Sequence, residues 1–163
     1  MSCLYIFGLG SPYGWDQAGW LAAGELGTTF AQQPGIRVDT LSHPTSLFVH
    51  PVTSGDWLVF IDCMVGKATP GTVQRFTPQT LPSSQSQLSS HGFDLKSTVD
   101  LLTEMGFSAE HIQIFAVEAP AQSVHMEAQP LQLFLDQATR VLHGTVKTWV
   151  DEWWVTRLDD LTA

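Results

Sequence analysis

Positively charged residues are scarce in this chain. Lysine and arginine together number 7, against 16 aspartates and glutamates, which gives a formal net charge of −9. Such a charge repels the phosphate backbone of nucleic acids and the anionic surface of membranes, and no cluster of basic residues offsets it. The composition therefore excludes a nucleic-acid or membrane partner and favours a protein partner with a basic segment.

Cysteines and long apolar runs are also few. Cys3 and Cys63 are the two cysteines, each in an apolar, strand-like run, and they form neither a disulfide framework nor a zinc-binding CxxC pair. No run approaches the ~18 apolar residues of a membrane span. The first residues lack the basic and apolar regions of a signal peptide. These absences predict a cytoplasmic protein, because free buried thiols are typical of a reducing compartment.

Apolar residues are plentiful. They make up 44% of the 163 residues, enough for one domain that spans residues 1–163. Six tryptophans and nine phenylalanines supply large side chains. We interpret the tryptophans as core residues, and a tryptophan-rich surface for a partner is the alternative.

The hydrophobic pattern alternates between strands and helices. Strands are predicted at 3–7, 34–41, 57–62, 72–78 and 111–119, the fourth at a sheet edge. Helices are predicted at 17–32, 93–106 and from Pro130 to about 142 or as far as 154, with a short helix or turn at 44–50. This order predicts an α/β fold, a three-layer α/β/α sandwich with a twisted, mainly parallel five-stranded sheet.

Polar residues follow the predicted strands at places where a parallel sheet binds ligands, outside the carboxyl ends of its strands. Asp62 ends the most apolar strand, where an unpartnered carboxylate is costly. Asp16 ends the first glycine-rich loop, where it also suits the N-cap of the first helix. His91 lies at the entry to a later helix. Together they form an oxygen and nitrogen ligand set suited to zinc or nickel.

Other reactive groups are weaker candidates. Glu118 ends a strand on the same sheet edge, and we expect it to accept hydrogen bonds from loop backbone, with a place in the pocket as the alternative. Arg75 is expected to have a structural role. The loop GLGSPYG is a poor dinucleotide fingerprint, so no nucleotide cofactor is expected. Without a GxSxG elbow, and with no helix beginning directly after Cys63, a covalent nucleophile is not expected either.

Three segments in order resemble the hydrogenase maturation protease family. They are FGLGSPYGWDQAGW at 7–20, FIDCMVGKATPGTVQRF at 60–76 and LSSHGFDLKSTVDLLTEMG at 88–106. The resemblance implies a three-layer α/β sandwich. It also implies an endopeptidase that removes the C-terminal tail from the large-subunit precursor of nickel–iron hydrogenases. Such a protease has no cofactor of its own, because it recognises nickel carried by the precursor.

The resemblance also assigns site residues. The family's aspartate after the third strand matches Asp62, and the histidine of its third motif matches His91; these two are the expected catalytic residues. The acidic pair of its first loop falls on Asp16 and Gln17, so the expected nickel-contacting set is Asp16, Gln17, Asp62 and His91. Gln17 stands where the family has its acidic ligand, and a neutral amide is a poor nickel ligand. The alternative is therefore a non-catalytic relative that binds a protein partner.

A second resemblance is confined to the first loop. GLGSP is similar to the opening of bacterial peptidyl-tRNA hydrolases. The Thr-Arg-His-Asn segment of that family is absent here, and a net charge of −9 does not suit a tRNA enzyme. We therefore favour the protease family.

Overall fold

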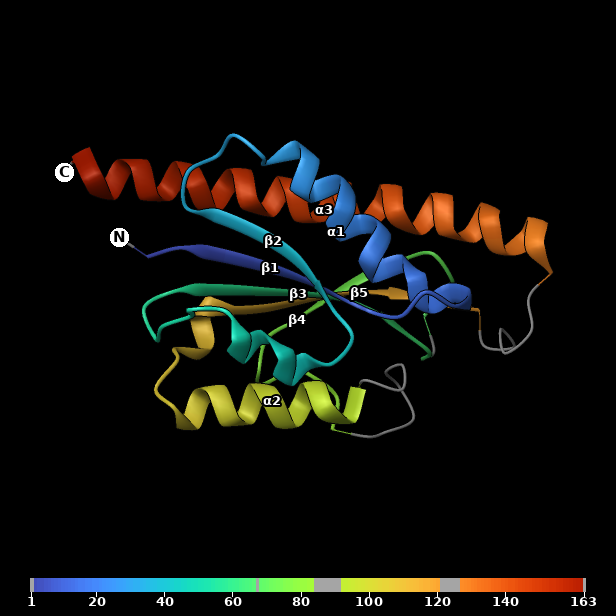
Figure 1. The fold of residues 1–163 in the computed structure, drawn as a ribbon, viewed down its shortest axis with the longest axis horizontal. Coiled ribbons are helices and arrows are strands. Elements are labelled where there is room, and N and C mark those ends of the chain that lie inside the picture. The colour runs from blue at the N-terminus through green and yellow to red at the C-terminus, as the bar shows by residue number, and fades with distance from the viewer. Residues whose placement is uncertain (1, 67, 84–91, 121–126, 163) are drawn as a thin grey trace.

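The fold is built on one sheet flanked by helices (Figure 1). A computed structural model describes the chain except for residues 1, 67, 84–91, 121–126 and 163; of residues 92–94 and 159–162 it describes the backbone. The strands are β1 (Leu4–Leu9), β2 (Ile36–Leu41), β3 (Trp57–Met64), β4 (Val73–Phe76) and β5 (Ile112–Glu118). The helices are α1 (Ala18–Thr29), α2 (Gly92–Glu104) and α3 (Ala128–Thr162), with short 3-10 helices η1 (Gly14–Gln17), η2 (Pro44–Val49) and η3 (Ala109–His111).

The sheet has five strands in the order β2-β1-β3-β5-β4. Strand β1 pairs in parallel with β2 and β3, and β3 pairs in parallel with β5. Strand β4 is antiparallel to β5 and lies at the edge. The predicted fold class, mainly parallel with an edge strand at this position, is confirmed. The inner strands are apolar throughout because both of their faces are covered.

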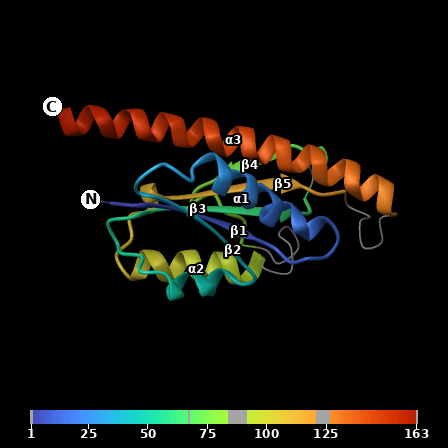
Figure 2. The same ribbon diagram turned by 45° about the horizontal axis from the view of Figure 1, so that its top comes forward.

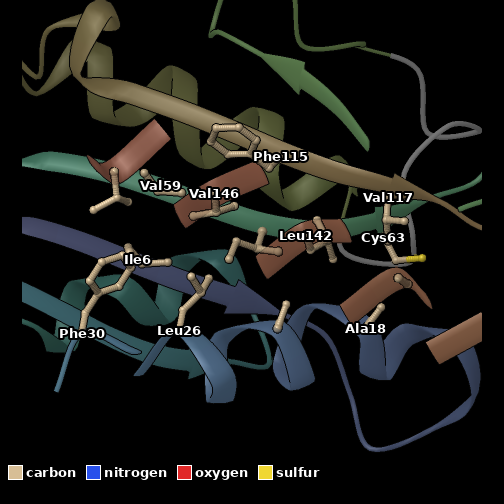
Figure 3. Packing of buried hydrophobic residues seen from close by; sticks show 14 of the residues in the cluster. Ile6, Ala18, Leu26, Phe30, Val59, Cys63, Phe115, Val117, Leu142 and Val146 are labelled. Atoms are coloured by element: carbon tan, nitrogen blue, oxygen red, sulfur yellow. The ribbon is translucent and has the colours of Figure 1, made fainter. Parts of the chain in front are cut away.

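Alternating residues of each strand enter two cores, one on each face of the sheet. Figure 2 shows α3 on one side of the sheet and α2 on the other. On one face, α1 and α3 cover a core that includes Ile6, Val59 and Phe115 (Figure 3). On the other face, Leu95, Val99 and Leu102 of α2 pack against Phe7, Phe60 and Ile114. This alternation fixes which face each polar residue at a strand end occupies.

Glycines bring the start of α1 directly onto the sheet. A Cβ atom at Gly19 would lie 2.1 Å from the Leu9 carbonyl oxygen and 3.0 Å from that of Ile61. A Cβ atom at Gly8 would lie 2.4 Å from the Gly19 carbonyl oxygen. Side chains would not fit at such separations, so these two glycines set the position of α1 and of the loop that precedes it.

Helix α3 is longer than the sequence pattern predicts. It begins at Ala128, two residues before Pro130, and its 35 residues continue through Gly144 to Thr162. The apolar side chains of Leu142, Val146 and Val150 on both sides of Gly144 are buried against the sheet, and this packing outweighs the helix-weakening effect of a glycine. Among the described helices, none combines the length and apolarity needed to cross a bilayer.

The tryptophans lie in or against the core, as the favoured interpretation predicts. Trp153 is buried, and the other five are partly buried; none is exposed. Trp57 stacks on His111 with ring centroids 4.2 Å apart and lies 6.2 Å from Trp153. The burial of the tryptophans therefore favours a core role over a surface for a partner protein.

Candidate active site

The polar residues singled out in the sequence follow strands that end on one side of the sheet. Because β1, β3 and β5 are parallel, their carboxyl ends meet at the same edge. From β1 the chain continues into β2 on one side, whereas β3 lies on the other side of β1. Such a reversal of strand order opens the crevice in which α/β sheets bind ligands.

Asp62 lies near the end of β3 and is completely buried, with an exposed fraction of 0%. Its neighbours Phe60 and Met64 enter the core beneath α2, so the two-residue period of the strand places Asp62 on the same face. The backbone N–H of Cys63 donates a hydrogen bond to Asp62 Oδ1 at 2.8 Å. A buried carboxylate at a strand end is costly to maintain, which makes Asp62 a strong functional candidate.

Asp16 and Gln17 are placed by η1, a turn that the sequence pattern does not predict. The Ser11 N–H donates to the Asp16 carbonyl oxygen at 3.3 Å, which closes the first loop. The sequence predicts Asp16 as the N-cap of α1, and this prediction is wrong. The N-cap is Gln17, one residue later. The Gln17 side chain turns back on the loop, where its Nε2 donates to the Gly14 carbonyl oxygen at 3.0 Å.

The pKa of the Cys63 thiol is sensitive to the charged residues near the carboxyl ends of the strands. Burial is the main cause that raises the pKa of its thiol above the ordinary value, and the carboxylates of Asp62, Asp16 and Glu118 raise that pKa further, in this order. Three carboxylates from β3, the first loop and β5 therefore act on one thiol. The negative charge of these carboxylates therefore extends to the carboxyl end of β3, where Cys63 lies.

The raised pKa predicts that Cys63 is unreactive. At pH 8 its thiol stays protonated, and a protonated thiol is a poor nucleophile. We expect iodoacetamide to alkylate the half-exposed Cys3 but not the buried Cys63 in the folded protein, and both after unfolding. Peptide mass mapping measures this. Rapid alkylation of Cys63 in the folded protein would show that this thiol is an accessible nucleophile.

Glu118 braces the loop that follows β3. The Gly66 N–H donates to Glu118 Oε1 at 2.5 Å, as expected for a carboxylate that binds loop backbone. The Glu118 carbonyl oxygen accepts from the Gly71 N–H, and its own N–H donates to the Thr72 carbonyl oxygen, both at 2.8 Å. One residue of β5 therefore holds both ends of the loop after β3.

His91 lies outside the described residues. Helix α2 begins at Gly92, the next residue, and this end of α2 lies on the side of the molecule where β1 and β3 end (Figure 1). Within the described part of the chain, no three histidine, cysteine, aspartate or glutamate side chains are grouped so that they could hold a metal ion. The expected nickel-contacting set thus remains a prediction.

Arg75, the remaining candidate, has a structural role. Arg75 Nε donates to Gln113 Oε1 at 2.8 Å, and its guanidinium lies 5.8 Å from the ring centroids of both Phe115 and Trp149. This agrees with the structural role expected for Arg75.

Solved structures of hydrogenase maturation proteases share this fold. HycI from Thermococcus kodakarensis KOD1 matches with a TM-score of 0.65 at 18% identity, over 90% of this chain and 91% of that one. The maturating endopeptidase HybD from Escherichia coli matches with a TM-score of 0.61 at 15% identity, over 90% of this chain and 93% of that one. At such identities the likeness establishes the fold alone.

Sequence comparison gives the family. None of the curated protein sequences matches the chain. Residues 44–134, more than half of the chain, match the model of the HycI family, described as hydrogenase maturation protease. The matched residues include Asp62, His91 and Glu118, whereas Asp16 and Gln17 precede them. The chain belongs to the hydrogenase maturation protease family.

Proposed function

We propose that this protein is an endopeptidase that removes the C-terminal tail of a nickel-loaded hydrogenase large-subunit precursor. The observation that carries the proposal is the buried carboxylate of Asp62 at the end of β3 in a chain of this family. The charge of a second carboxylate, Asp16, acts with that of Asp62 on the Cys63 thiol. The precursor brings the nickel, and the protease contributes the negatively charged site that recognises it.

In this proposal Asp62 and His91 contact the nickel carried by the precursor, and Asp16 adds negative charge from the first loop. The substrate's nickel, acting as a Lewis acid, polarises the carbonyl of the scissile peptide so that water can attack it. The residues of the protease fix the position of this metal relative to the peptide. Such positioning is effective because the start of α1 and the loop after β3 are both held against the sheet.

Gln17 has a lesser part in the proposal. Its amide is a poor nickel ligand and already donates a hydrogen bond to the Gly14 carbonyl oxygen. Asp16, its neighbour in η1, is the carboxylate of the first loop that remains. We therefore propose that Asp16 supplies the charge that a glutamate at position 17 would otherwise give.

We also propose a cytoplasmic location and a precursor with a basic docking surface. The two cysteines are free, which suits a reducing compartment. The net charge of −9 attracts a basic partner over a distance of about a Debye length, ~8 Å at physiological salt. The rate of association should therefore fall as salt is added.

The variant Gln17→Glu tests this function together with the wild-type protein. We expect wild type to cleave the nickel-loaded precursor and Gln17→Glu to cleave it at least as fast, because the variant adds a carboxylate at the site. Gel mobility of the precursor measures cleavage. Gln32→Glu adds the same charge after the far end of α1 and should leave the rate unchanged.

One outcome would overturn the endopeptidase proposal. In that outcome, wild type and Gln17→Glu both bind the nickel-loaded precursor, but neither cleaves it. The protein would then be a non-catalytic member of the family that binds its partner without cutting it.

A further inference from the structure

Glu118 lies next to Asp62 on the same face of the sheet. It is the last residue of β5 and pairs with Met64 of β3, while Asp62 pairs with Ala116. Met64 and Ala116 both enter the core beneath α2, so the two-residue period puts Asp62 and Glu118 on that face. The two carboxylates are diagonal neighbours on adjacent strands, a separation that long side chains can bridge.

The Glu118 side chain is half-satisfied. It is 1% exposed, and Oε1 is fixed by the Gly66 N–H. Oε2 is buried as well, and no described residue gives it a hydrogen bond. A buried carboxylate oxygen without a donor costs free energy, so the position indicates a ligand that the described residues do not supply.

The loop after β3 is shaped around this carboxylate. A Cβ atom at Gly66 would lie 3.3 Å from both Glu118 carboxylate oxygens, which is closer than most side chains tolerate. Glycine at this position lets the backbone approach Oε1 and hold the carboxylate still. Ion pairs among the described residues join other partners, and none of them includes Glu118.

A divalent cation is the ligand that best fits this setting. Asp62 and Glu118 place two buried carboxylates on one face of the sheet, so negative charge accumulates there. Buried charges are normally paired or coordinate metals. A neutral hydrogen-bond donor would satisfy Oε2 but would leave that accumulated charge in place.

We infer that Glu118 gives its free oxygen, together with Asp62, to the nickel ion that the precursor carries. The inference rests on the proposed function and adds a residue to it. Two carboxylates leave most positions around the ion to ligands from the precursor itself, which suits a metal that arrives already bound. Glu118 thereby adds to the charge that Asp16 supplies in place of a glutamate at position 17.

Nickel binding by the full-length protein tests this role. Isothermal titration with Ni²⁺ alone should show binding by wild type and an affinity at least about tenfold lower in Glu118→Gln, since even groups behind a metal ligand change affinity by ~10–100-fold. The variant keeps the acceptor for the Gly66 N–H, so the loop should keep its shape. Glu110→Gln removes an exposed carboxylate at the amino end of β5 and should bind Ni²⁺ as wild type does.

The outcomes separate this role from the proposed function. Equal Ni²⁺ binding by wild type and Glu118→Gln, including no binding by either, would overturn the role of Glu118. Precursor cleavage by wild type alongside such equal binding would leave the endopeptidase function standing. A third outcome is weaker Ni²⁺ binding by Glu118→Gln than by wild type, together with no cleavage of the precursor by wild type. That outcome would overturn the endopeptidase function and leave the role of Glu118 in place.

Discussion

Replacing Asp62 with asparagine should lower the rate of precursor cleavage by at least about a hundredfold, the upper end of what is lost when a group merely supports a metal ligand. Asparagine has the shape of aspartate and keeps an oxygen for the Cys63 N–H, so the site should retain its geometry. What it loses is the negative charge that faces the substrate's nickel. Single-turnover cleavage of the nickel-loaded precursor measures the effect.

The same variant should be no less stable than wild type. The charges of Asp62, Asp16 and Glu118 all raise the pKa of the buried Cys63 thiol, and removal of one of them should reduce the repulsion among these negative charges. Thermal unfolding checks this. Asp100→Asn is the matched control, because Asp100 pairs with Lys96 on the surface of α2 and should affect neither property much. Normal cleavage by Asp62→Asn would remove Asp62 from the mechanism.

Gly19→Ala should destabilise the protein by at least about 3 kcal/mol, at the upper end of overpacking effects. The added methyl group would lie 2.1 Å from the Leu9 carbonyl oxygen, and backbone on both sides leaves it no room. Helix α1 would have to move away from β1 and β3, and η1 with Asp16 would move with it. Urea unfolding followed by circular dichroism measures the loss.

A second glycine in α1 provides the control. No heavy atom lies within 4 Å of the Cβ position at Gly24, so Gly24→Ala should stabilise the helix by about 0.5–1 kcal/mol. The two substitutions change helix propensity in the same way but should change stability in opposite directions. The difference is due to the contact of Gly19 with the sheet. If Gly19→Ala were as stable as Gly24→Ala, α1 would not be held against the sheet in the way described.

The architecture could be predicted from the sequence because its signals are local. Apolar runs such as residues 57–62 are typical of strands covered on both faces, and Gly106 follows the last turn of α2 with a φ of +93°, as a helix-ending glycine should. The length of α3 could not be predicted, since Gly144 weakens the helix locally. Burial of Leu142 and Val146 on either side of it depends on the tertiary fold.

The site could be predicted in part. Asp62 is conspicuous as a carboxylate that ends an apolar strand, and parallel strands bring such ends together. The N-cap role predicted for Asp16 is wrong because η1 adds a turn before α1. The hydrogen bond from loop backbone to Glu118 agrees with the sequence prediction. The close contact of Gly19 with Leu9 arises between different elements of the fold, and a single sequence carries no signal for such a contact.

The mass of a hydrogenase large-subunit precursor, measured after incubation with this protein, tests the central claim most directly. Two samples are compared, one precursor loaded with nickel and one free of it. We expect the nickel-loaded precursor to lose its C-terminal tail and the nickel-free precursor to keep its full mass. A nickel-loaded precursor that keeps its full mass would contradict the endopeptidase function, and equal cleavage of both samples would contradict recognition through nickel.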